Sequence, residues 1–287
     1  MMKRTYILIF SLLFIGYSFG QDVQETYTST RIINGHSVET LKARILQFRI
    51  EHRFGDFAGA NGGIQNMFGF DNVADVRFAF EYGVTDKLML GFGRSKGAGN
   101  PYRSLLDGFA KYRFLTQNKE KGIPISLALI ECASLTYMKP SMDQSQVAHF
   151  PDFAHRLAYS SQINIARKFG ERLSLSIMPT YTHRNYVDID DQNGVFAFGS
   201  AFAFRLSKEF SLSAEYYHAF NQNGLRANNK NSLGIAFEWI TNGHNFKINF
   251  TNSQGFGETQ FIPYTYENWL RGQFRLGFCV SRQFSWS

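Results

Sequence analysis

The chain has 287 residues, a formal net charge of +7 at pH 7 and a mean hydropathy of −0.24. No segment approaches the roughly 18 consecutive apolar residues of a transmembrane helix, which excludes a helical membrane protein. Basic residues alternate with acidic ones, as in Arg49, Glu51 and Arg53, so no nucleic-acid partner is expected. Aromatic residues make up 16% of the chain. This content favours a membrane β-barrel, because the outer face and the interface girdles of such barrels are rich in Phe, Tyr and Trp.

The first twenty residues have the pattern of a secretory signal peptide. Lys3 and Arg4 form a short basic head, an apolar run of about 10 residues follows, and Ser-Phe-Gly at 18–20 resembles a cleavage site. The apolar run is too short to span a membrane, so we expect residues 1–20 to be removed during export. Residues 21–42 then form an N-terminal segment that either stays in the periplasm or inserts into a lumen.

Residues 43–287 show the alternation of a transmembrane β-barrel. Apolar and polar residues alternate in about twelve segments of roughly 8 to 12 residues, each bounded by turn residues. The expected strands are residues 43–54, 74–82, 88–95, 105–114, 125–137, 154–166, 173–183, 195–206, 212–220, 232–240, 245–251 and 273–286. Short connections alternate with long polar ones, as periplasmic turns and extracellular loops do in bacterial barrels. The sequence therefore predicts an all-β fold, a closed antiparallel barrel with both ends in the periplasm.

The clearest alternation lies at residues 195–206. Phe196 and Phe198 occupy one face, while Ala197 and Ala201 occupy the other. This pattern fits lipid on one side and a crowded lumen on the other.

Two residues break the alternation. Glu131 falls on the face assigned to lipid, and Pro179 lies inside a strand without an N–H for the ladder. A lipid-facing charge near the middle of the membrane costs on the order of a few kcal/mol. We therefore expect either residue to mark a β-bulge, with a local register change at Glu131.

Both ends of the expected barrel resemble known proteins. The last strand places Leu276, Phe278, Val280, Phe284 and Trp286 on one face. It resembles the terminal recognition strand of barrels that the outer-membrane assembly machinery inserts, so this machinery and outer-membrane lipid are expected partners. An Asn-Gly-His-Ser segment at 34–37 precedes a first strand that reads LQFRIEHRFG at 46–55. In this plan the chain resembles an uncharacterised family, a domain of unknown function, of small Gram-negative outer-membrane β-barrel proteins. The resemblance implies the fold and an outer-membrane location, and it brings no assigned activity.

No motif predicts catalysis or a bound cofactor. Outer-membrane phospholipases use His-x-Ser, whereas His36 and Ser37 are adjacent, so that an extended chain points their side chains apart. We favour a polar contact that ties the N-terminal segment to the barrel. The histidines lack zinc-site spacing, and the acidic run at 188–191 departs from a calcium loop at its sixth and twelfth positions. We therefore expect no enzyme activity, no metal and no cofactor, and a solvated hairpin tip at the acidic run.

Charged residues of both signs are expected on the lumen face. They are Arg49, Glu51, Arg53, Asp75, Arg77, Glu81, Asp107, Lys111, Arg113, Arg156, Arg205, Glu215, Glu238, Lys247 and Arg275. Such charges either pair across a narrow interior and fill it, or line a water pathway for small polar or anionic solutes. A barrel of about twelve strands is intermediate in width, and we slightly favour the narrow or plugged form.

Three functions are compatible with a charged lumen of this kind. The first is a narrow solute pathway or a small-ligand-binding barrel. The alternative is a structural or docking barrel that engages a partner through its extracellular loops. A lipid-modifying enzyme is the third.

The two cysteines are expected to stay apart. Alternation puts Cys132 and Cys279 on lumen-facing positions of the fifth and twelfth strands. These strands lie far across the lumen of a twelve-stranded ring, whereas a disulfide tolerates a Cα separation of only about 4.4 to 6.8 Å. We predict two free thiols that react slowly with bulky maleimides.

Overall fold

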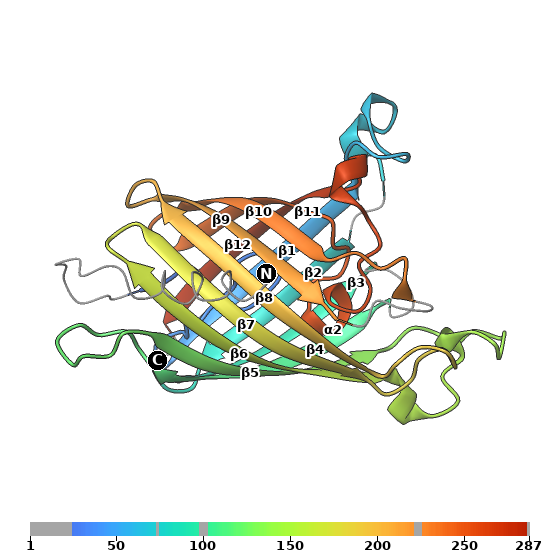
Figure 1. Cartoon of the computed structure of the whole chain (residues 1–287), viewed down its shortest axis with the longest axis horizontal. Helices are drawn as coiled ribbons and strands as arrows, with labels where there is room; N and C mark the ends of the chain where they lie inside the picture. Colours follow the sequence, from blue (N-terminus) through green and yellow to red (C-terminus); the bar gives the residue numbers. More distant parts are fainter. Residues whose placement is uncertain (1–24, 73–74, 98–102, 221–225, 286–287) are drawn as a thin grey trace, which may run out of the picture.

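The computed structural model describes residues 25–72, 75–97, 103–220 and 226–285, and the expected signal peptide at residues 1–20 lies outside them. Within this part of the chain, twelve antiparallel strands form a closed barrel (Figure 1). The strands are β1 (Ile45–Asp56), β2 (Asp75–Gly83), β3 (Leu88–Lys96), β4 (Leu105–Leu115), β5 (Ser126–Thr136), β6 (Leu157–Phe169), β7 (Leu173–Arg184), β8 (Gly194–Arg205), β9 (Phe210–Ala219), β10 (Ser232–Ile240), β11 (His244–Thr251) and β12 (Arg275–Ser285). Each strand pairs with its neighbour in the sequence, and β1 closes the ring against β12. The predicted barrel of about twelve strands is confirmed.

Short and long connections alternate around the barrel, as predicted (Figure 1). Short helical turns lie in the long connections: η1 (Ile64–Gly69), η2 (Val147–His149), η3 (Phe153–Arg156), α2 (Glu258–Phe261) and η5 (Trp269–Arg271). No helix in the described ranges is long and apolar enough to cross a membrane. The strand expected at 154–166 begins later, at Leu157, because η3 occupies the preceding residues.

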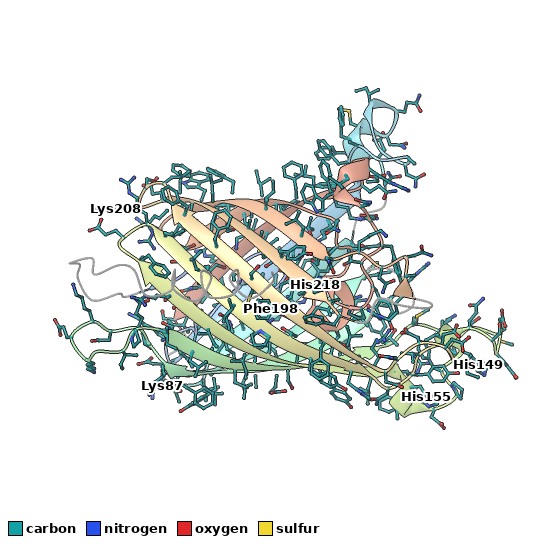
Figure 2. The ribbon with its side chains drawn as sticks, viewed as in Figure 1. Lys87, His149, His155, Phe198, Lys208 and His218 are labelled. Carbon is teal, nitrogen blue, oxygen red and sulfur yellow. The ribbon has the colours of Figure 1, made fainter. Side chains whose placement is uncertain are left out.

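The two faces of the wall differ in size and polarity. In β8, Phe196, Phe198 and Phe202 point outward and are 60%, 43% and 42% exposed, whereas Ala197 and Ala201 face the lumen and are buried. Figure 2 shows Phe198 on this outer surface. Closure of the ring pairs the backbone N–H and C=O groups of every strand with a neighbour, so no open edge faces lipid.

The expected register change at Glu131 is wrong. The ladders on both sides of β5 run unbroken through this residue, which pairs with Ala110 on β4 and Ser161 on β6. The Glu131 side chain stays on the outer face and accepts a hydrogen bond from Ser161 Oγ at 2.5 Å. A one-residue slip would turn the whole strand inside out, which costs more than one hydrogen-bonded carboxyl group at the surface. Pro179 likewise lies opposite Phe198 with no bulge beside it.

This placement of Glu131 predicts a stabilising substitution. Glu131→Leu should raise the free energy of unfolding by about 1 to 2 kcal/mol, because a carboxyl group is costly on the lipid face. Urea unfolding of the folded protein in lipid vesicles measures the change. Glu171→Leu, at an exposed short turn, is the matched control and should leave the value unchanged. A loss of stability in Glu131→Leu would show that the outer face of β5 does not contact lipid.

Candidate functional site in the barrel lumen

The N-terminal segment lies inside the barrel. Residues 25–42, the plug, enter at the end that carries the short turns, where Ala43 N donates to Asp86 Oδ1 at 2.9 Å. The plug turns back on itself in the lumen, and Ile32 N donates to Gly35 O at 2.9 Å across this turn. All residues from 30 to 39 are buried. The tip of the plug reaches the far ends of β10 and β11, where Asn34 Nδ2 donates to Thr251 Oγ1 at 3.2 Å and to Ser232 Oγ at 3.3 Å. The plug is therefore a hairpin that extends along the lumen.

A second insert enters from the opposite end. The long connection at residues 252–274, the lumen loop, carries α2, and its Phe256, Glu258 and Phe261 are buried. The two inserts meet at Arg31 of the plug. Its guanidinium donates to Phe256 O at 3.0 Å and lies 3.7 Å from Glu258 Oε2. Segments of the chain therefore enter the lumen from both ends and meet inside it.

Small wall residues make room for the plug. Ala128, Ala197 and Ala236 are at most 5% exposed and form one apolar cluster with side chains of the plug and the lumen loop, including Ile33 and Phe261. This packing excludes water from the contact between the two inserts and the wall.

Glycine at position 35 is required by the wall. A Cβ atom built on Gly35 would lie 2.0 Å from Tyr217 Oη and 3.0 Å from Tyr217 Cζ. Any larger residue at the tip of the hairpin must displace either the tyrosine or the plug.

The ammonium group of Lys111 binds the backbone of the plug. Its Nζ donates to three plug carbonyls, those of Thr30 at 2.7 Å, Glu39 at 2.9 Å and Ser37 at 3.0 Å. Lys111 is fully buried on β4. Because a buried ammonium is costly unless its three donors are satisfied, this residue needs the plug in place.

Glu215 holds the tip of the plug from the other side. Its carboxylate accepts hydrogen bonds from the backbone N–H groups of Asn34 at 2.6 Å, Ile33 at 3.0 Å and Gly35 at 3.2 Å. Lys247 Nζ donates to the carbonyl of Arg31 at 2.9 Å. The wall thus supplies charged partners for both the donors and the acceptors of an irregular backbone, which has no ladder of its own to satisfy them.

The base of the plug is fixed by Glu39. Its Oε1 accepts from Thr26 N at 2.8 Å and Tyr27 N at 3.2 Å, and its Oε2 pairs with Arg113 at 3.0 Å. Burial raises the pKa of Glu39, and Arg113 and the two amides oppose this shift. These bonds close the hairpin on itself and join it to β4.

Other wall charges pair with each other. Arg49 lies 3.2 Å from Glu81, and Arg77 lies 2.5 Å from both Glu51 and Asp107. These contacts join β1 to its neighbour β2, and they join β2 to β4 across the intervening strand β3. The plug also contacts the first pair, because Arg49 donates to Thr30 Oγ1 at 2.6 Å and Thr30 Oγ1 donates to Glu81 Oε2 at 2.9 Å.

The candidate lumen residues occupy three kinds of position. Ten of them are buried in the lumen: Arg49, Glu51, Arg53, Asp75, Arg77, Glu81, Lys111, Glu215, Glu238 and Lys247. Asp107, Arg113, Arg205 and Arg275 are half-buried. Arg156 lies outside the strands in η3, where its guanidinium donates to Met138 O at 2.8 Å. Sequence alternation places side chains on a face, but it does not show that the plug would be their partner.

The interpretation of His36 and Ser37 as a polar tie agrees with their contacts. Ser37 Oγ donates to Ser29 O at 2.5 Å, and Asn164 Nδ2 on β6 donates to His36 O at 2.7 Å. Burial lowers the pKa of His36 well below its ordinary value, and the nearby cations Arg31 and Lys111 add to this shift. Both causes favour the neutral imidazole.

The acidic run at 188–191 forms a loop tip with one inward residue. Asp188 and Asp190 are exposed, and Asp191 pairs with Arg184 at 2.9 Å. The aspartates therefore do not converge on a common point.

Both cysteines lie on the lumen side and are free. Arg49 NH1 donates to Cys279 Sγ at 3.2 Å, whereas Cys132 Sγ lies 3.9 Å from Glu258 Oε2. The predicted lumen-facing positions are confirmed, and each thiol has a different charged neighbour.

A ring of strands with an apolar outer face and a charged interior defines a membrane-spanning barrel. Residues 27–284 match the family described as Membrane bound beta barrel domain (DUF5777), and the chain belongs to this family. The predicted resemblance to a barrel family of unknown function is thereby confirmed. No curated protein matches the sequence.

Two solved outer-membrane proteins share the fold. The KdgM porin in complex with disordered oligogalacturonate aligns with 84% of this chain and 99% of that chain, at 8% identity and a TM-score of 0.50. The COG4313 outer membrane channel from Pseudomonas putida F1 aligns with 86% of this chain and 98% of that chain, at 16% identity and a TM-score of 0.50. The family confirms a membrane barrel, and the shared fold agrees with the predicted location in the outer membrane.

The role of Glu215 predicts a local loosening of the plug. Glu215→Ala leaves three buried N–H groups without their acceptor, at a cost of about 2 kcal/mol. Amide hydrogen exchange of residues 33–35 should then become about 30-fold faster, while exchange in β9 and β10 stays slow. Glu209→Ala, at an exposed short turn, is the control. Equal exchange of residues 33–35 in the two variants would contradict the proposed anchoring.

Proposed function

We propose that this protein is an outer-membrane solute channel whose lumen is closed by its own N-terminal plug. The observation that carries the proposal is the kind of contact that holds the plug. Lys111 and Glu215 bind its backbone through hydrogen bonds, and the only covalent link of the plug to the barrel within the described residues is the chain that runs into β1. Such contacts can be exchanged for water when the plug moves.

The wall itself suits a water pathway. A barrel with a purely structural role can fill its lumen with large wall side chains. Here small residues such as Ala197 and Gly199 leave the space to a separate segment. The pairs Arg49–Glu81 and Arg77–Glu51 would keep the exposed wall polar after the plug moves.

The groups that the plug releases favour anions. Lys111 and Lys247 donate to plug carbonyls, and Arg53 donates to the side chain of Asn34. Glu215 is the acidic residue that accepts from the plug backbone. Arg49, Arg113 and Lys168 also bond to the plug, and so do the acids Glu81 and Glu238. Displacement of the plug therefore frees six cations and three anions of the wall, so the class of solute that we propose is small polar or anionic molecules.

A docking barrel is the second candidate. The connection between β1 and β2 extends away from the barrel (Figure 1). Its residues Ile64, Met67 and Phe70 are 72%, 56% and 48% exposed, and Leu270 of the lumen loop is 95% exposed. Exposed apolar side chains of this kind are typical of a surface that contacts a partner.

Conductance of single proteins in a planar bilayer separates the two candidates. Gly35→Val drives the tip of the plug against Tyr217 and replaces no residue of the wall, so this variant should show discrete conductance steps far more often than the wild-type protein. Gly257→Ala is the control, because a Cβ atom at Gly257 lies 3.9 Å from its nearest neighbour, Thr259 Oγ1. If folded Gly35→Val shows no conductance steps, the channel is rejected and the docking barrel is favoured.

Ion selectivity tests the charge argument. Open Gly35→Val channels should pass anions in preference to cations, because Lys111 and Lys247 no longer bind plug carbonyls. Adding Lys111→Gln should lower the ratio of anion to cation permeability, measured from reversal potentials in a salt gradient. Lys208→Gln, at an exposed short turn (Figure 2), should leave the ratio unchanged. A cation preference in Gly35→Val would contradict the proposed pathway.

A further inference from the structure

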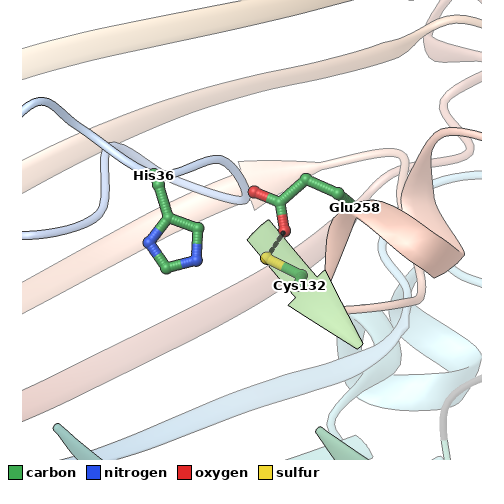
Figure 3. A group of neighbouring side chains, drawn as sticks. All are labelled: His36, Cys132 and Glu258. Carbon is green, nitrogen blue, oxygen red and sulfur yellow. Dashed lines mark hydrogen bonds between the residues drawn. The ribbon is translucent and has the colours of Figure 1, made fainter. Parts of the chain in front are cut away.

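Three side chains with metal-binding atoms meet where the plug, the wall and the lumen loop come together (Figure 3). His36 comes from the plug, Cys132 from β5, and Glu258 from the first residue of α2. One ligand atom of each residue lies within 4.8 Å of the corresponding atoms of the other two. Local sequence spacing could not reveal this group, because its members come from three distant parts of the chain.

Two atoms of this group are buried without a partner. His36 and Glu258 are each 1% exposed, and among the described residues neither His36 Nδ1 nor Glu258 Oε1 has a hydrogen-bond partner. The other carboxylate oxygen, Glu258 Oε2, lies 3.9 Å from Cys132 Sγ. The ring nitrogen of His36 that faces Cys132 and Glu258 is Nε2 (Figure 3). Buried polar atoms are almost always paired, so the unpaired Glu258 Oε1 beside this imidazole and thiol indicates a ligand.

We propose that His36, Cys132 and Glu258 form a binding site for Zn²⁺. Imidazole nitrogen, thiolate sulfur and carboxylate oxygen are the donors that Zn²⁺ takes in proteins, and a set of three leaves a fourth position for water. The thiolate disfavours Mg²⁺ and Ca²⁺, which prefer oxygen donors. On binding, the Cys132 thiol releases its proton to solvent, and the resulting thiolate and the carboxylate balance the two positive charges of the ion.

The surroundings hold the ligands in place. The His36 ring packs against Phe109 with a centroid distance of 4.4 Å, which fixes the position of the imidazole. Arg31 lies 3.7 Å from Glu258 Oε2 and also donates to the carbonyls of Asn34 and Phe256. The guanidinium therefore remains anchored when the carboxylate turns toward the ion.

The origin of the three ligands gives the ion a regulatory role, and this step rests on the proposed channel. Zn²⁺ would tie the plug to β5 and to the lumen loop at once. The plug could then leave the lumen only after losing His36 as a ligand. The ion would stabilise the closed channel, because it binds the closed arrangement and not the open one.

Cobalt absorption tests the site directly. Co²⁺ titrated into the full-length protein in detergent should give a near-ultraviolet thiolate-to-cobalt band that saturates at one equivalent and disappears when Zn²⁺ is added. Cys132→Ser should abolish the band, and Cys279→Ser, which removes the other buried thiol, should retain it. Absence of the band from the wild-type protein, or its retention in Cys132→Ser, would overturn the site.

Zn²⁺ affinity adds an independent readout for the carboxylate. Glu258→Gln keeps the size of the side chain and should weaken Zn²⁺ binding at least tenfold by isothermal titration calorimetry, with one site per chain in the wild-type protein. Equal affinity in both proteins would remove Glu258 from the site. These measurements use no conductance. If the wild-type protein binds Zn²⁺ and Gly35→Val shows no conductance, the metal site stands and the channel is rejected. If Gly35→Val conducts and the wild-type protein binds no Zn²⁺, the channel stands and the metal site is rejected.

Discussion

Charge buried in the lumen must find a partner, and this constraint decides how the interior of the barrel is built. Arg49 and Arg77 meet it within the wall, through acids on neighbouring strands. Lys111 and Glu215 meet it through the backbone of the plug, which offers carbonyls to the first and amides to the second. The same bonds satisfy a backbone segment that has no sheet to join. The wall charges and the plug therefore stabilise each other, and water must take over these hydrogen bonds when the plug leaves the lumen.

The plug also depends on the small size of the wall residues that face it. Alanine and glycine on the lumen side of β8 and β10 leave space, and the plug and the lumen loop fill it with larger apolar side chains. The closed state thus combines directional bonds at the ends of the hairpin with close packing along it. Small displacements of the tip break both, since Gly35 already touches Tyr217. This coupling explains how the plug and the lumen loop together can fill a lumen that twelve strands surround.

Much of the wall could be predicted from the sequence, and little of the interior could. Alternation in β8 is strict because lipid and lumen impose opposite demands on adjacent residues. The contacts of Lys111 could not be predicted from the sequence, because its partners are backbone carbonyls, which every residue carries. Glu258 lies in a polar connection that reads as a solvated loop, yet it is buried. Glu131 was misjudged because its partner, Ser161, lies on the next strand and leaves no trace in the local pattern.

A disulfide between the plug and the wall tests most directly whether the plug closes the lumen. A Cβ atom at Gly234 lies 3.5 Å from Ile33 Cβ, within the range of about 3.5 to 4.5 Å that a disulfide spans. Ile33→Cys and Gly234→Cys would be combined with Glu215→Ala, which loosens the plug, and with serine at both native cysteine positions. In a planar bilayer, the oxidised protein should be silent and should show conductance steps once the disulfide is reduced. Equal conductance in the oxidised and reduced states would contradict the account.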